Sequence, residues 1–76
     1  INIYVEFEDL NDISAIIEKI KSCDVKIFDV EITKAKNSET HYPYAVFSIK
    51  LPKKLTHAML MANIAQLETV RSIEEL

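Results

Sequence analysis

The first twenty residues change from a repeat of two to a helical repeat, and this change limits the folds open to the chain. Residues 1–7 alternate apolar and polar side chains, which is typical of a strand with one buried face. After the acidic turn of residues 8–12, isoleucines recur at helical spacing: Ile13, Ile16, Ile17 and Ile20. The pattern predicts a strand, a tight turn and an amphipathic helix that pack their apolar sides together.

Two further runs with a repeat of two predict a hairpin. One strand is expected over residues 25–35, with Phe28, Val30 and Ile32 on its apolar side. Val25 and Ile27 have the opposite parity, which either a β-bulge or a different environment at the start of the strand would reconcile. The other strand is expected over residues 42–51, with Pro43 at its start. The polar residues 36–40 between them predict a loop.

The last third predicts a second helix and a short strand. Thr56 is a suitable N-cap, and apolar residues follow at helical spacing: Leu60, Met61, Ile64 and Leu67. Met59 lies outside this stripe and is expected to be exposed. Residues 70–74 then form the last expected strand.

The expected order is strand, helix, strand, strand, helix, strand over a single domain of residues 1–76. Two strand–helix–strand units with right-handed crossovers interleave into one sheet. The sequence therefore predicts an α+β, ferredoxin-like βαββαβ sandwich, with a four-stranded antiparallel sheet and both helices on one face.

The other face of this sheet has no covering layer among the expected elements. The parity of the strands places Tyr4, Tyr44 and Val46 on it, beside acidic side chains. These three residues are apolar enough to predict an interface, and an ordinary solvated sheet face is the alternative.

Composition excludes several function classes. The chain has 12 acidic and 9 basic residues, and Arg71 is its one arginine, so no nucleic-acid partner is expected. It has no glycine, which excludes glycine-rich phosphate loops and dinucleotide fingerprints. No apolar run approaches the ~20 residues of a membrane span. Because the chain begins at Ile1 rather than Met, it is expected to be a soluble fragment of a longer protein.

Catalytic and metal signals are weak. His41 and His57 are distant from each other in the sequence and in the expected fold, and Cys23 is expected to be a small apolar group. The acidic turn of residues 8–12 could hold a hard cation loosely, but capping the helix is its expected role. We expect no enzyme activity, no cofactor and no metal.

The turn after the first strand resembles that of ACT domains, in which Asp-x-Pro-Gly precedes an apolar helix. Asp9 and Ile13 match this pattern, and Asn11 and Asp12 stand at its proline and glycine positions. The resemblance implies an ACT-like domain. It also implies Asn11, Asp12 and Ile13 as the contacts of a small ligand, an amino acid, in the alternative that the chain is the sensor of a soluble metabolic enzyme.

Several segments are similar to the soluble C-terminal tail of MgtC/SapB-family membrane proteins. They are residues 27–32, 51–52, 56–58 and 67–76. This resemblance implies a non-enzymatic regulatory or interaction domain on the cytoplasmic face of the membrane, within a protein linked to magnesium transport or virulence. Its expected partner is a second copy of the chain or the parent's membrane domain.

Overall fold

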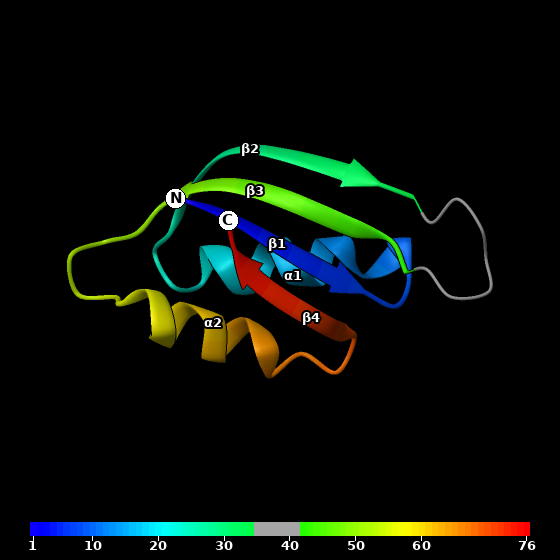
Figure 1. Cartoon of the computed structure of the whole chain (residues 1–76). Coiled ribbons are helices and arrows are strands. Elements are labelled where there is room, and N and C mark those ends of the chain that lie inside the picture. Colours follow the sequence, from blue (N-terminus) through cyan, green and yellow to red (C-terminus); the bar gives the residue numbers. More distant parts are fainter. Residues whose placement is uncertain (35–41) are drawn as a thin grey trace.

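The computed structural model describes residues 1–34 and 42–76 (Figure 1). Along the chain it contains β1 (Asn2–Phe7), the short 3₁₀ turn η1 (Leu10–Asp12), α1 (Ile13–Lys21), β2 (Lys26–Thr33), β3 (Tyr44–Lys50), α2 (His57–Ala65) and β4 (Val70–Glu75). The loop expected over residues 36–40 and the expected position of His41 lie outside the described residues.

The strands form one antiparallel sheet in the order β2-β3-β1-β4. In Figure 1 both helices lie on the same side of this sheet. The order places β1, the first strand of the chain, between β3 and β4, which are the first and last strands of the second strand–helix–strand unit. The predicted α+β, ferredoxin-like arrangement is therefore confirmed.

The core lies between the sheet and the two helices. Its fully buried side chains come from the inner sides of the two central strands and from one stripe on each helix, and each is at most 2% exposed: Ile3, Val5, Phe7, Ala45, Phe47, Ile49, Ile16, Ile20, Leu60 and Ile64. Met59 is 52% exposed, as its place outside the helical stripe predicts. The apolar side of β1 and the apolar stripe of α1 therefore pack into the same layer.

Two of the short helices start with a hydrogen bond from a backbone N–H group to a capping side chain. The Asp9 carboxylate accepts a hydrogen bond from the backbone N–H of Asn11 at the start of η1, at 2.9 Å. The Thr56 hydroxyl accepts one from the N–H of Met59 in α2, at 3.1 Å. Asp24, which follows α1, has φ of 61°, a left-handed conformation that Asp tolerates better than most residues.

Replacing the cap of α2 is expected to cost about 1 kcal/mol in the free energy of unfolding. Thr56→Ala leaves the N–H of Met59 without its side-chain acceptor, whereas Thr56→Ser keeps a hydroxyl at the same place. Urea unfolding followed by circular dichroism would measure both variants. Equal stability of Thr56→Ala and Thr56→Ser would mean that the hydroxyl does not stabilise the helix.

The expected bulge in β2 is present, but it lies at Phe28. Ile27 pairs with Ile49 of β3 and Asp29 pairs with Ser48, so Phe28 is the extra residue between them. Its ring is 60% exposed and lies 5.4 Å from the Lys26 ammonium nitrogen. The prediction that Phe28 joins the apolar side of this strand is therefore wrong.

Ile32, farther along β2, is on the predicted side of the sheet because it pairs with the buried Ala45. It is nevertheless 46% exposed, since β2 is an edge strand.

Candidate interaction surface

The side of the sheet away from the helices, which we call the open face, carries the three residues predicted as an interface. Tyr4 lies opposite Val46 in the pairing of β1 with β3, and Tyr44 lies opposite Glu6. Successive residues of a strand point to opposite sides, so these side chains face away from the buried Ile3 and Val5. The structure therefore brings Tyr4, Tyr44 and Val46 together at the middle of the open face.

The two tyrosines contact each other diagonally across the central strands. Their ring centroids are 5.0 Å apart and the ring planes are inclined by 37°. The Tyr4 hydroxyl donates a hydrogen bond to the Glu6 carboxylate at 3.2 Å. Both rings are half-buried although no helix of the described residues covers them. Tilted tyrosine pairs of this kind present apolar ring surface to a partner and carry polar hydroxyl groups at their ends.

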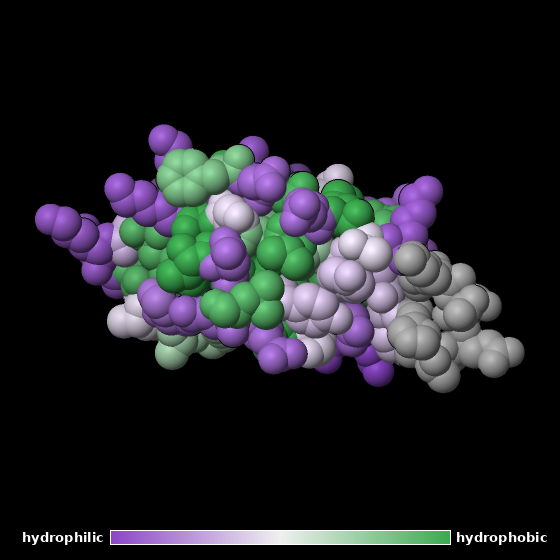
Figure 2. All heavy atoms as spheres, turned by 45° about the horizontal axis from the view of Figure 1, so that its top comes forward, coloured by the Kyte–Doolittle hydropathy of each residue, from purple (hydrophilic) through white to green (hydrophobic). Residues whose placement is uncertain are grey.

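Carboxylates lie on both sides of this apolar centre. One row of residues crosses all four strands, because Glu31 of β2 pairs with Val46 and Glu74 of β4 pairs with Tyr4. In the next row Asp29 pairs with Ser48. Figure 2, in which β2 has come forward, shows green and pale side chains across the middle of the molecule with purple side chains around them.

Within the four strands as the structure describes them, the lysines are Lys26 of β2 and Lys50 of β3, and these two pair with each other at one end of this pattern. Near the other end, the Arg71 guanidinium lies 3.1 Å from the Glu8 carboxylate and 5.1 Å from the centre of the Tyr42 ring. The middle of the open face is consequently acidic, with an apolar centre.

The surroundings of Tyr4 change the acidity of its phenol. Burial, and after it the negative charge of Glu6 and the hydrogen bond to Glu6, raise the pKa of Tyr4 above the ordinary value of 10.0. A neutral phenol is favoured because ionisation would place a second negative charge beside a carboxylate.

This pKa shift predicts a loss of stability in alkali. The folded protein holds the Tyr4 proton more tightly than the unfolded chain, so the stabilisation is complete below pH 10.0 and is lost as the pH rises through the folded-state pKa. Unfolding measurements across this range should show that Tyr4→Phe loses less stability than the natural protein. Parallel stability curves for the two proteins would contradict the prediction.

Of the residues expected to contact an amino acid, Asn11 and Asp12 lie in the 3₁₀ turn η1, and Ile13 is the first residue of α1. The N–H of Asn11 donates to the Asp9 carboxylate, that of Asp12 to the Asp9 carbonyl, and that of Ile13 to the carbonyl of Leu10. The Asp12 carboxylate accepts a hydrogen bond from the Thr69 hydroxyl. These three N–H groups are thus already paired within the chain, and a ligand carboxylate would have to displace those bonds.

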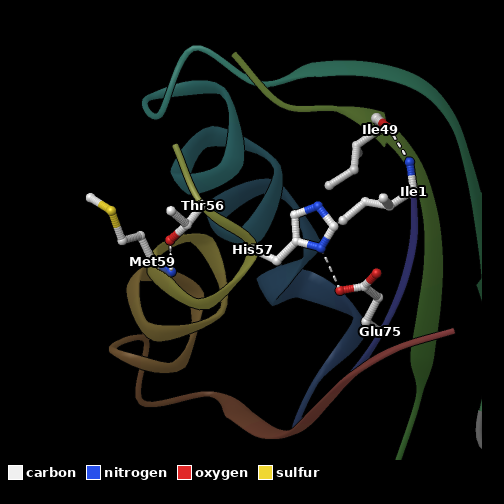
Figure 3. Close-up of polar contacts among 6 residues, drawn as sticks. All are labelled: Ile1, Ile49, Thr56, His57, Met59 and Glu75. Atoms are coloured by element: carbon white, nitrogen blue, oxygen red, sulfur yellow. Dashed lines mark hydrogen bonds and ion pairs between the residues drawn. The ribbon is translucent and has the colours of Figure 1, made fainter. Parts of the chain in front are cut away.

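A contact that the sequence did not predict joins α2 to β4. Figure 3 shows His57, at the start of α2, pointing toward Glu75 at the end of β4. His57 Nδ1 and Glu75 Oε1 are 2.8 Å apart, and the two side chains are 53% and 38% exposed. Nearby, the nitrogen of Ile1 donates to the Ile49 carbonyl at 2.8 Å. Residues 18 positions apart meet here only because α2 returns the chain to β1, so no local pattern could have indicated the pair.

Among residues 1–34 and 42–76, no three His, Cys, Asp or Glu side chains gather where they could hold a metal ion. None of the helices in the same two ranges has the length and apolar character needed to cross a membrane. A scan against protein-family models finds no match for the chain, and a search of curated proteins finds none either.

Proposed function

We propose that the chain is a non-enzymatic, ACT-like regulatory or interaction domain that binds protein through the open face of its sheet. We further propose that it forms the tail, on the cytoplasmic face of the membrane, of an MgtC/SapB-type protein linked to magnesium transport or virulence. The ferredoxin-like fold supports the ACT-like part of this proposal. The similarity of residues 27–32 and 67–76 to such tails supports the rest.

The observation that carries the proposal is the apolar centre of the open face. An antiparallel sheet with one solvated face usually alternates apolar and polar sides cleanly. Here Tyr4, Tyr44 and Val46 occupy the solvated side of the two central strands. Phe28, on the bulge beside Asp29 and 5.4 Å from the Lys26 ammonium, adds a 60% exposed ring at the edge. Neighbouring apolar side chains that solvent reaches, with a polar rim around them, are typical of protein contact sites.

Hydroxyl-radical footprinting can test whether this face is covered in the native protein. The chain on its own and the native full-length protein would be oxidised in parallel, and the modified residues would be identified by mass spectrometry. If a partner covers the open face, oxidation of Phe28 and Tyr44 should fall in the full-length protein. Met59, which is 52% exposed on α2, serves as the internal control and should react equally in both samples.

A pair of variants makes this experiment specific. Tyr44→Glu places a charge at the apolar centre and should restore the oxidation of Phe28 in the full-length protein. Met59→Glu places the same charge on α2 and should leave Phe28 protected. Equal oxidation of Phe28 and Tyr44 in the chain and in the full-length protein would refute a contact role for the open face.

A further inference from the structure

We propose that the open face binds a cationic amphipathic helix, whose apolar side lies on Tyr4, Tyr44 and Val46 between the carboxylates of β2 and β4. This inference rests on the proposed function, since it names the chemistry of the partner that the face would take. Three features of the face lead to it: its width, its length and the placement of its charges.

The width of the apolar centre suits one helix. Glu31 on β2 and Glu74 on β4 belong to the same row, and they are separated by three steps between neighbouring strands. At about 4.8 Å a step, the two backbones are about 14 Å apart. A helix with its side chains is about 10–12 Å across, so it would fill the central strands and leave its flanks beside the two carboxylates.

The length of the face sets the length of helix that it can contact. From Asn2 to Glu6, the outward residues of β1 cover four residue steps, or about 14 Å of strand. A helix rises 1.5 Å per residue, so about nine of its residues would lie along this distance. Apolar residues at positions i, i+3, i+4 and i+7 of such a segment would meet the tyrosines and Val46.

The charges select a cationic partner. Asp29 and Glu31 lie on one flank of the apolar centre, and Glu74 lies on the other. The lysines of the face, Lys26 and Lys50, are at one end of this pattern rather than beside its centre. Lysine or arginine side chains on both flanks of a helix would therefore meet carboxylates, and electrostatic complementarity of this kind favours encounter with the right partner.

The same charges disfavour a second copy of the chain. Two copies of the sheet can stack face to face, with their strands aligned, through a two-fold axis that runs either along the strands or perpendicular to them within the plane of the contact. The axis along the strands places β2 of one copy over β4 of the other. The perpendicular axis places β2 over β2 and β4 over β4. In both arrangements, Glu31 or Glu74 faces another carboxylate at the rim of the contact, and like charges placed opposite each other cost binding energy.

A designed peptide can test the inference on the chain itself. The probe is a capped 15-residue helix of leucine, alanine and lysine, with leucines along one side and lysines on both flanks. Its controls are the same peptide with glutamate in place of lysine and a scrambled lysine peptide without an apolar side. We expect the lysine helix to bind at least tenfold more tightly than either control, with the largest amide shift changes in magnetic resonance spectra at Tyr4, Tyr44 and Val46.

Charge variants of the chain provide the matched comparison. The pair Glu31→Gln and Glu74→Gln removes one carboxylate from each flank and should weaken binding of the lysine helix at least fivefold. The pair Glu18→Gln and Glu68→Gln changes the net charge equally at exposed positions on α1 and before β4, outside the open face, and should leave binding unchanged. Added salt should weaken binding of the lysine helix to the natural chain more than its binding to the variant with Glu31→Gln and Glu74→Gln. Screening reduces a charge attraction that this variant lacks.

Several outcomes would overturn the inference. Equal affinity for the lysine and glutamate helices would remove the charge argument, and shift changes confined to α2 would place the contact elsewhere. A doubled mass in light scattering that Tyr44→Glu returns to that of one chain would identify a second copy as the occupant. If Phe28 and Tyr44 are protected in the full-length protein while the lysine helix does not bind, the inference fails and the proposed function stands. If Phe28 and Tyr44 are not protected and the lysine helix does not bind, the inference and the proposed function both fail.

Discussion

Phe47→Ala is expected to lower the free energy of unfolding by about 3–5 kcal/mol, whereas Phe28→Ala is expected to change it by less than about 1 kcal/mol. The two residues have the same side chain on neighbouring strands. Phe47 is 0% exposed in the core, and its removal leaves a cavity between the sheet and the helices. Phe28 is 60% exposed on the bulge, and the Lys26 ammonium lies over its ring, a contact worth about 0.5–1 kcal/mol at exposed sites.

Urea unfolding followed by circular dichroism would measure both variants. A domain of 76 residues has a total stability of roughly 4–11 kcal/mol, so Phe47→Ala can leave too little folded protein for a full curve. Phe47→Leu, which removes less volume, should then unfold at a urea concentration between those of the natural protein and Phe47→Ala. A loss for Phe28→Ala as large as that for Phe47→Ala would show that Phe28 is part of the core.

This pair of residues also shows how far the sequence alone can predict the fold. The change of repeat within residues 1–20 predicted β1 and α1, and the two later alternating runs predicted β2 and β3, because local spacing decides which side of an element is apolar. A bulge was expected from the parity of Val25 and Ile27, but parity does not say which residue is the extra one. The pairing of Ile27 with Ile49 and of Asp29 with Ser48 decides that, and it excludes Phe28 from the core.

The candidate surface could be predicted only in part, because alternation along a strand is a local pattern whereas the pairing between strands is not. Tyr4 and Tyr44 share a face because each alternates with core residues in its own strand, and the antiparallel register then brings their rings within 5.0 Å. The position of the flanking carboxylates across four strands depends on that register and on the strand order, neither of which a local pattern contains. The turn of residues 8–12 lies between strand and helix as predicted, whereas the hydrogen bonds within it were not foreseen.

Ile16→Ala in α1 is expected to lower the free energy of unfolding by about 2–5 kcal/mol, although it replaces a modest helix former with the best one. Helix propensity alone would make the variant more stable by a few tenths of a kcal/mol. Ile16 is 0% exposed, however, and it belongs to the core cluster that joins α1 to the sheet. The lost packing therefore outweighs the gain in propensity several-fold.

Glu18→Ala is the matched control for this prediction, because Glu18 is exposed on the same helix and alanine again has the higher propensity. Its free energy of unfolding should stay within about 0.5 kcal/mol of that of the natural protein. Thermal or urea unfolding of the two variants separates the contributions directly. If Ile16→Ala were as stable as Glu18→Ala, α1 would be held by its own propensity, and its isoleucines would not explain why a nine-residue helix forms here.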